Sequence, residues 1–213
     1  EYTYYGHGSC YQFGRKDPMR YNVTTDTNAA TTVALETSIL NPGTFYTKWI
    51  GLDKYNLWTG KESKKYSLIE LLGSNYYAEE GSDKIKTIYD PSPAGYKVPS
   101  VKAFTGFTKD GKKCGGDEGT YQLTDSNVSG SYHHGWDFYT NSSHTSTIYF
   151  PSAYCRISTG VQGSGGIGRY RTSTANSDSN DGSFEFQFQS TYVYPMTEKS
   201  SKANALPIRP ITE

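Results

Sequence analysis

The clearest alternation of apolar and polar positions lies near the C-terminus, in the segment SFEFQFQSTYVY at residues 183–194. Phe184, Phe186 and Phe188 are separated there by single polar residues. Because successive side chains of a strand point to opposite faces, this pattern predicts a strand with one buried face. We therefore expect the phenylalanines to lie in the core and the polar residues between them to be exposed.

Two tyrosines that follow this alternation can occupy either face of the predicted strand. Tyr192 and Tyr194 have the same parity as the phenylalanines, so a regular strand would bury them. A bulge near Ser190 and Thr191 would instead turn them to the polar face. The sequence is consistent with both arrangements.

Further short apolar segments occur in the second half of the chain, separated by turn-forming residues. Strands are expected at residues 136–139, 146–157, 168–174, 184–194 and 206–211. The segments GVQGSGGIG (160–168) and STANSDSNDGS (173–183) are rich in Gly, Ser and Asn, which predicts loops. We find no internal repeat and no linker, so the pattern predicts one α+β domain that covers residues 1–213.

The best helix candidate follows the proline-rich segment IYDPSPAGYKVPS at residues 88–100. Ser100 is a suitable N-cap, and Val101, Phe104 and Phe107 follow it at intervals of three residues. The earlier part of the chain is less regular. We expect a turn or short helix that ends at Pro18.

Three segments between Pro18 and the proline-rich segment have weaker patterns. One short element is expected at residues 33–40, within an irregular excursion at residues 24–47. Residues 48–58 include two tryptophans, Trp49 and Trp58, which are expected to anchor this excursion to the core. The leucine-rich residues 64–77 fit either a helical turn or a loop.

Composition favours a strand-rich extracellular domain over a helical enzyme. Only 34% of the residues are hydrophobic, but the chain contains 20 Tyr, 9 Phe and 3 Trp. The 21 basic and 21 acidic residues cancel, so no net field attracts nucleic acid or an anionic membrane. No apolar segment approaches the roughly 20 residues of a membrane span. The chain begins at Glu1 without a signal peptide, so we interpret it as a mature or excised segment.

Candidate metal sites are weak in this sequence. Cys10, Cys114 and Cys155 are widely spaced, so they permit at most one intramolecular disulfide and do not form a zinc motif. His133 and His134 with Asp137 could form a metal cluster, but adjacent side chains of a strand point to opposite faces. We favour a solvated loop for these histidines and expect no metal or other cofactor.

Catalytic motifs are also absent from the sequence. A hydrolase needs a nucleophile beside a base and an orienting group, and the chain contains no Gly-x-Ser-x-Gly segment. The adjacent acidic pairs at residues 79–80 and 117–118 are flanked by glycine, which is typical of solvated loops. The GGIG segment lacks the Lys-Ser/Thr of a phosphate-binding loop. We therefore expect a protein that is not an enzyme.

Five segments in a fixed order resemble a known family. They are YQFGRKDPM, IYDPSPAGYKVPS, GWDFYT, IYFPSAYCR and ANALPIRPI. In this order and spacing they resemble the Fibrobacter succinogenes major paralogous domain, over roughly residues 4–213. That family occurs in secreted, lipid-anchored and pilus-associated surface proteins of Bacteroidetes and their relatives. The resemblance implies a C-type lectin-like fold, of the kind shared with formylglycine-generating enzymes, with small antiparallel sheets and one or two short helices.

The resemblance also assigns a structural role to the proline-rich segment. It implies that this turn leads the chain into a helix that packs on the central sheet, with Tyr96 and Val98 in the core. The chain departs from the family at several positions. Ser92 replaces a frequent Cys, Cys155 replaces a more usual Gly, and Arg171 replaces a common Trp. The opening strand usual in the family is not visible, so we expect part of the first sheet upstream of Glu1.

Two activities known for the implied fold are not supported by this sequence. Formylglycine-generating enzymes need a reactive cysteine pair, which the three scattered cysteines do not supply. Calcium-dependent lectins use a Glu-Pro-Asn or Gln-Pro-Asp loop and a Trp-Asn-Asp segment, and neither occurs in this chain. Neither aldehyde formation nor calcium-mediated sugar binding is expected.

The expected function is therefore adhesion or recognition at a bacterial cell surface, either at a pilus tip or in a lipoprotein anchored to the outer membrane. In relatives of this fold the C-terminal strands and loops form the ligand face, and in some of them diversity-generating retroelements randomise this segment. The candidate contacts for a protein or glycan ligand are Tyr170, Arg171, Asn176, Asp178, Glu185, Gln187, Gln189, Tyr192 and Tyr194. Arg171 and Gln187 are expected to be exposed. Alternative functions are a carbohydrate-binding module, because 15% of residues are aromatic, and a structural pilin subunit.

Overall fold

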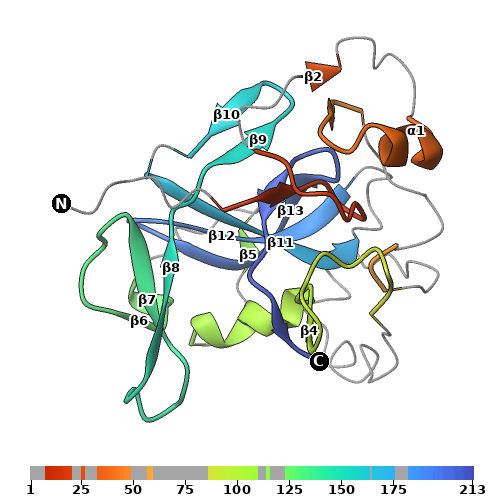
Figure 1. The fold of residues 1–213 in the computed structure, drawn as a ribbon. Helices are drawn as coiled ribbons and strands as arrows, with labels where there is room; N and C mark the ends of the chain where they lie inside the picture. Colours follow the sequence, from red (N-terminus) through yellow and green to blue (C-terminus); the bar gives the residue numbers. More distant parts are fainter. Residues whose placement is uncertain are drawn as a thin grey trace.

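The computed structural model describes residues 8–20, 25–26, 33–48, 57–59, 86–109, 114–115, 123–163, 165–175 and 182–213. These residues form a strand-rich α+β structure of small, mostly antiparallel sheets with few helices, as Figure 1 shows. The helical elements are α1 (Leu35–Leu40) and the 3₁₀ helices η1 (Val101–Phe107) and η2 (Leu123–Asp125). The expectation for residues 64–77 lies outside the described residues.

Among the described residues, two sheets contain more than two strands. The central sheet has the order β11-β12-β13-β5, with β11 (Ile167–Ala175), β12 (Gly182–Gln189), β13 (Val193–Ser201) and β5 (Cys114–Gly115). A second sheet has the order β6-β7-β8, with β6 (Val128–Ser129), β7 (Gly135–Tyr139) and β8 (Thr147–Pro151). Within the central sheet only the short β5 runs parallel to its neighbour.

Four pairs of short strands complete the described structure. They are β1 (Cys10–Tyr11) with β14 (Leu206–Pro207), β9 (Cys155–Ile157) with β10 (Gly160–Gln162), β4 (Tyr96–Lys97) with β15 (Ile211–Thr212), and β2 (Thr25–Asp26) with β3 (Phe45–Tyr46). The pairings join the beginning of the chain to its end. Cys10 lies opposite Pro207, and Arg156 bridges to Ala205 on the same C-terminal segment.

The phenylalanine row of β12 is buried, which confirms the prediction from the alternating pattern. Phe184, Phe186 and Phe188 are each 0% exposed. Phe186 stacks on Phe104 of η1 at a centroid distance of 4.7 Å, and Phe138 of β7 contacts both Phe186 and Phe188. One aromatic core therefore joins the central sheet, η1 and the second sheet.

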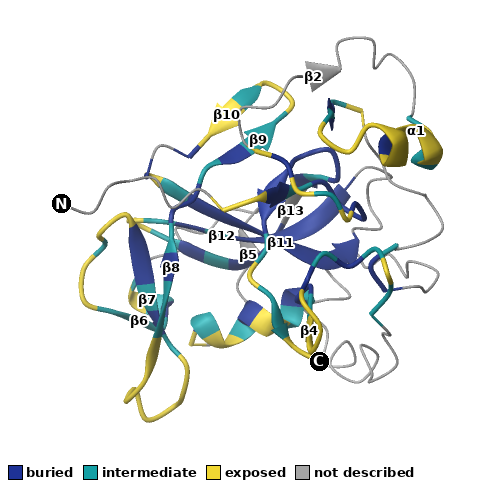
Figure 2. Cartoon of the chain, in the orientation of Figure 1, coloured by how far each residue is buried: buried dark blue, intermediate teal, exposed yellow. Residues whose placement is uncertain are grey.

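The opposite face of β12 is also buried, so the prediction of an exposed polar face is wrong for its inner part. Glu185 is 1% exposed, and Figure 2 shows buried residues along much of β11, β12 and β13. The C-terminal segment after β13 and the β9–β10 hairpin cover this face, through contacts described below. Alternation of apolar and polar residues shows which side chains share a face of a strand. It does not show whether the polar face is exposed to water or buried in a polar network.

The helix predicted after Ser100 is present, but it is a 3₁₀ helix rather than an α-helix. The three-residue spacing of its apolar side chains matches the three residues per turn of that helix type. Ser100 occupies the N-cap position without a capping hydrogen bond from its side chain, and the Val101 amide donates to Thr174 Oγ1 of β11 at 3.1 Å. The acceptor at the start of η1 is thus Thr174 of the central sheet, and not the Ser100 side chain that the sequence predicted.

The proline-rich turn confirms one of its two expected core residues. Val98 is buried, whereas Tyr96 is 45% exposed on β4, where it lies opposite Thr212 of β15. The Asp90 carboxylate closes this turn by accepting bonds from the Ser92 and Val98 amides at 2.8 and 2.9 Å. Sequence reasoning had not identified this role for Asp90.

Other expected elements are present with different boundaries. The short element predicted at residues 33–40 is α1, and Trp58 is fully buried, as expected for an anchor. The segment before Pro18 is a turn, and the Cys10 and Met19 amides each donate to the other's carbonyl. The expected strands at 146–157, 184–194 and 206–211 are each divided into two. Residues 160–162, expected in a loop, form β10.

Candidate functional site

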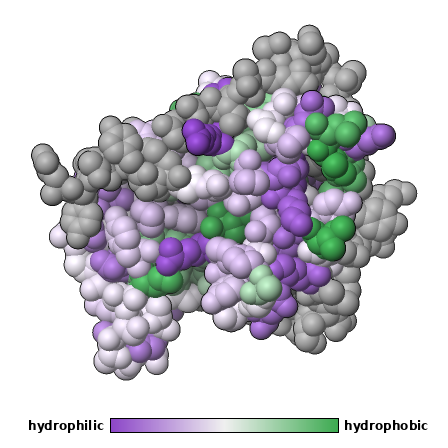
Figure 3. Space-filling model, in the orientation of Figure 1, coloured by the Kyte–Doolittle hydropathy of each residue, from purple (hydrophilic) through white to green (hydrophobic). Residues whose placement is uncertain are grey.

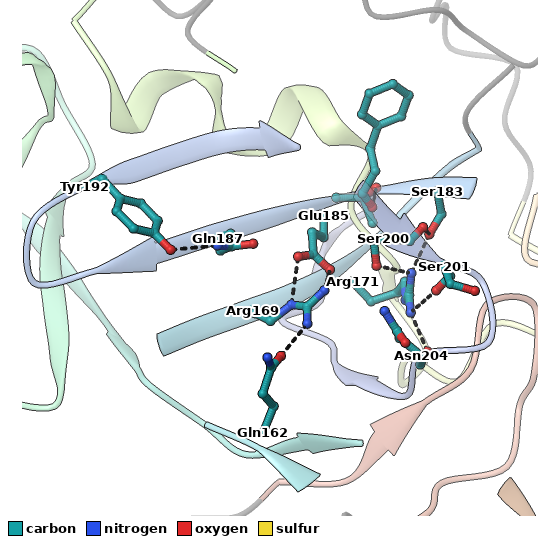
Figure 4. Close-up of polar contacts among 12 residues, drawn as sticks. Gln162, Arg169, Arg171, Ser183, Glu185, Gln187, Tyr192, Ser200, Ser201 and Asn204 are labelled. Atoms are coloured by element: carbon teal, nitrogen blue, oxygen red, sulfur yellow. Dashed lines mark hydrogen bonds and ion pairs between the residues drawn. The ribbon is translucent and has the colours of Figure 1, made fainter. Parts of the chain in front are cut away.

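The candidate contacts that the structure describes lie mostly on the polar face of the central sheet, which Figure 4 shows in close-up. The strand register aligns Arg169, Gln187 and Tyr194 in one row across β11, β12 and β13. The next row contains Arg171, Glu185 and Thr197. Asn176 and Asp178, two of the nine candidates, lie outside the described residues.

A bidentate ion pair links the two rows. Arg169 Nε donates to Glu185 Oε1 at 2.8 Å, and Nη2 donates to Oε2 at 3.0 Å. Arg169 Nη1 also donates to Gln162 Oε1 of β10 at 2.7 Å, which holds the β9–β10 hairpin over the sheet. Burial opposes the charge of Arg169, but the Glu185 carboxylate raises the pKa of the guanidinium. Glu185 is therefore a structural partner of Arg169 rather than a ligand contact.

Arg171 is 0% exposed, so the expectation that it is accessible is wrong. Its Nη1 donates to the hydroxyls of Ser183 and Ser200, and its Nη2 donates to the carbonyls of Ser201 and Asn204. Burial lowers the pKa of this guanidinium to about 10, and the nearby Glu185 carboxylate opposes that effect. Arg171 thus fastens the C-terminal segment to β12 and β13, which removes it from the candidate contacts.

Tyr170 lies on the other face of β11, within the aromatic core. Its ring packs edge-on against Phe150 at 5.0 Å, and its hydroxyl donates to the Pro151 carbonyl at 2.6 Å. Burial raises the pKa of this phenol. The structure therefore assigns Tyr170 to the core and corrects its place among the ligand contacts.

Four candidate residues remain partly exposed at the open end of the face: Gln187, Gln189, Tyr192 and Tyr194. The rings of Tyr192 and Tyr194 stack with centroids 4.2 Å apart, and Gln187 Nε2 donates to the Tyr192 hydroxyl at 2.7 Å. We call Gln187, Tyr192 and Tyr194 the tyrosine patch. The pKa of the Tyr192 phenol is raised, because partial burial disfavours its charged form more than the hydrogen bond from Gln187 favours it.

The sequence left two arrangements of the tyrosines open, and the structure places them on the polar face because the chain reverses direction between β12 and β13, rather than through a bulge in one strand. β12 ends at Gln189, whose amide donates to the Tyr192 carbonyl at 2.9 Å, and β13 begins at Val193. The register also shifts between Glu185 and Gln187. Tyr194 consequently lies opposite Gln187, whereas Val193 packs in the aromatic core.

Two residues that hold Glu185 in place were not identified from the sequence. Arg169 lies within the strand expected at residues 168–174, and its partner Gln162, exposed on β10, lies in the glycine-rich segment that predicted a loop. The available signal was the alternation of Arg169 with Arg171, two positions apart on the strand that faces Glu185. Equal parity on neighbouring strands places such residues on one face.

The described residues do not form a metal site. Among them, no group of three or more His, Cys, Asp or Glu side chains lies close enough to hold an ion. His133 Nε2 is 3.7 Å from the Asp137 carboxylate, and its ring stacks on Tyr149 at 4.9 Å. His134 is exposed. In the described part of the chain no helix has the length and apolar character needed to span a membrane.

Comparison with known proteins adds no relative to this description. No family model matches the chain, and no curated protein or solved structure matches it either. The resemblance to the Fibrobacter succinogenes major paralogous domain therefore stays a prediction from the sequence motifs.

Proposed function

We propose that this chain is a non-enzymatic recognition domain of a bacterial surface protein, with the C-type lectin-like fold that its sequence motifs imply, and that the tyrosine patch binds a protein partner. The observation that carries the proposal is the stacked, half-exposed pair of Tyr192 and Tyr194. Tyrosine supplies a large contact area at a low cost in conformational entropy, which is why binding loops of antibodies are rich in it.

The support beneath the patch is consistent with this role. Gln187 and Tyr194 lie beside Arg169, whose side chain is held by Glu185 and Gln162. Gln187 also holds the Tyr192 hydroxyl. Groups fixed before binding lose less freedom when a partner docks, so a preorganised patch gains affinity from the same contacts.

The cellular setting rests on the family resemblance. Proteins with these motifs are found at the surface of Bacteroidetes, so we place the chain outside the cell, in an outer-membrane-anchored protein or at a fimbrial tip. The partner would then be a protein on a host or neighbouring cell, or another subunit of the same pilus. The balanced charge of the chain fits recognition by shape and aromatic contacts better than electrostatic capture.

The test begins with surface proteins of host or neighbouring cells, captured on the immobilised chain and identified by mass spectrometry. The affinity of each purified partner is then measured for the native chain and for Tyr192→Ala and Tyr194→Ala. Each variant is expected to weaken binding by about 1–3 kcal/mol. Tyr96→Ala is the matched control, because Tyr96 is also exposed but lies on β4. Equal losses in all three variants, or a loss in the control alone, would move the site away from the tyrosine patch.

A further inference from the structure

A cleft of about 720 Å³ lies away from the tyrosine patch, between η1, the β7–β8 hairpin and the C-terminal residues 209–211. Its volume falls within the range of small-molecule sites, about 300–1,000 Å³. In Figure 3 the hairpin tip forms a separate lobe, and the outline of the molecule is hollowed beside it. None of the three residues of the tyrosine patch lines this cleft.

The floor of the cleft is apolar and rigid. Phe104 and Phe150 are buried in the aromatic core, with their centroids 6.1 Å apart, and Phe107 packs on Phe138 at 4.4 Å. All of these rings except Phe138 line the cleft. A ligand at this position would therefore rest on the packed core, which holds the shape of the floor.

The rim at the hairpin tip presents a fixed pair of aromatic rings. Tyr139 and His144 stack with centroids 4.1 Å apart and planes 9° apart. The loop between them is closed by Asn141, whose Oδ1 accepts from the Thr145 amide at 3.0 Å and whose Nδ2 donates to Thr145 Oγ1 at 2.9 Å. His144 has a left-handed backbone, with φ of 55°, that this closed loop maintains.

The charge of the cleft is positive although the chain as a whole is neutral. Lys109 and Arg209 both line it, and no described residue of the lining carries a carboxylate. The Arg209 guanidinium carbon lies 5.4 Å from the centroid of Phe150, so its position is supported by the ring. A planar guanidinium presents paired donors that match a carboxylate, so an anionic ligand is favoured.

Neutral hydrogen-bonding groups surround these cations. Asn127 Nδ2 donates to the carbonyls of Gly106 and Thr108 at 2.8 and 3.2 Å, which leaves Oδ1 as an acceptor with no partner among the described residues. Thr105 and Ser142 also line the cleft. Several neutral groups around a charged one match a ligand with many hydroxyls and one acidic group.

We propose that this cleft binds an acidic sugar, a sugar residue that carries a carboxylate. Arg209 pairs with the carboxylate, the Tyr139–His144 pair contacts the apolar face of the ring, and Asn127 accepts a hydroxyl proton. An acidic peptide would also satisfy the charge, but extended peptides commonly bind by adding a strand to a free edge. The rim instead is a closed loop, in which Thr140 and Ser146 bond to each other.

The test compares sugars that differ only in the acidic group. Binding is measured by calorimetry for galacturonic acid against galactose and for glucuronic acid against glucose. At least one acidic sugar is expected to bind about tenfold more tightly than its neutral counterpart. No binding of any acidic sugar at millimolar concentration would overturn the proposal, and so would equal affinity for acidic and neutral members of every pair.

Matched variants locate the binding site of the acidic sugar. Arg209→Gln should remove the tenfold preference, whereas Arg20→Gln, at an exposed arginine outside the lining, should retain it. His144→Asn should weaken all sugars several-fold, because Asn tolerates the left-handed backbone but lacks the ring. Tyr192→Ala should leave sugar binding unchanged, so a failure of the tyrosine patch is separable from a failure of this cleft. Unchanged affinity in both Arg209→Gln and His144→Asn would place the sugar elsewhere and overturn the assignment.

Discussion

At the scale of single residues, the polar face of β12 separates groups that support the fold from groups that can contact a partner. Glu185 and Gln187 are two positions apart on the same face, yet Glu185 is fully enclosed and Gln187 is half-exposed. The difference comes from neighbours far along the chain, since Arg169 and the C-terminal segment cover only the inner row. Substitution of Glu185 should therefore change the stability of the fold, whereas substitution of Gln187 should change the binding of a partner.

Glu185→Gln should lower the free energy of unfolding by about 3–5 kcal/mol, because it leaves the charge of Arg169 buried without its partner. Urea unfolding measures this loss. Glu36→Gln, at an exposed glutamate of α1, serves as the control and should change stability little. Restoration of part of the stability is expected in the Arg169→Gln/Glu185→Gln double variant. A loss no larger than that of the control would show that the ion pair does not stabilise the fold.

The two buried thiols predict a decline of stability at high pH. Cys10 and Cys155 are free, and burial raises their pKa values to about 12 and about 11, above the ordinary 9.0. The folded state thus holds these protons when the unfolded state releases them. This contribution is complete below about pH 9 and is lost as the pH rises through the folded values. Unfolding midpoints should fall more steeply over this range in the native chain than in Cys10→Ala/Cys155→Ala, and parallel curves would argue against the mechanism.

At the scale of elements, β11 and β12 pack so closely that one position of β11 admits only glycine. Gly168 lies opposite Phe188 in the register, and a Cβ added to Gly168 would overlap the Phe188 ring. Gly168→Ala should therefore cost about 1–3 kcal/mol of stability through overpacking. Gly166→Ala is a matched control, because an added Cβ there has no neighbour within 4 Å. Thermal unfolding compares the two, and equal effects would contradict a steric role for Phe188.

The elements also show which parts of the fold could be predicted from the sequence. The strands at β7, β11 and β12 and the helix after Ser100 followed from local apolar spacing, which depends on residues close in sequence. The exposed Tyr96, the β10 strand and the buried Arg171 did not follow from it. Tyr96 and Arg171 depend on partners far along the chain, in β15 and in residues 200–204, and a single sequence does not specify those pairings. β10 pairs with the neighbouring β9, although its glycine-rich sequence is typical of loops. The strands that carry the candidate contacts were therefore predicted, but three of the seven described candidates, Tyr170, Arg171 and Glu185, are buried rather than exposed.

At the scale of the whole molecule, the ends of the described chain close on the central sheet. β14 pairs with β1 and packs on β11, and the Arg171 contacts hold the segment before it. The central sheet is thus enclosed by η1 and the aromatic core on one side and by the C-terminal segment on the other. α1, by contrast, is a six-residue helix with a single buried side chain, at Ser38. Such short helices gain little stability of their own.

This contrast predicts two levels of local stability within the described chain. Amides of β12 should exchange with solvent on the order of a thousandfold more slowly than those of α1, because their opening requires global unfolding whereas α1 can open alone. Hydrogen exchange followed by mass spectrometry resolves the two segments. Addition of denaturant below the unfolding transition should accelerate exchange in β12 and leave α1 nearly unchanged, since only the former depends on the exposure of the core. Equal protection of α1 and β12 would mean instead that the helix unfolds only together with the central sheet.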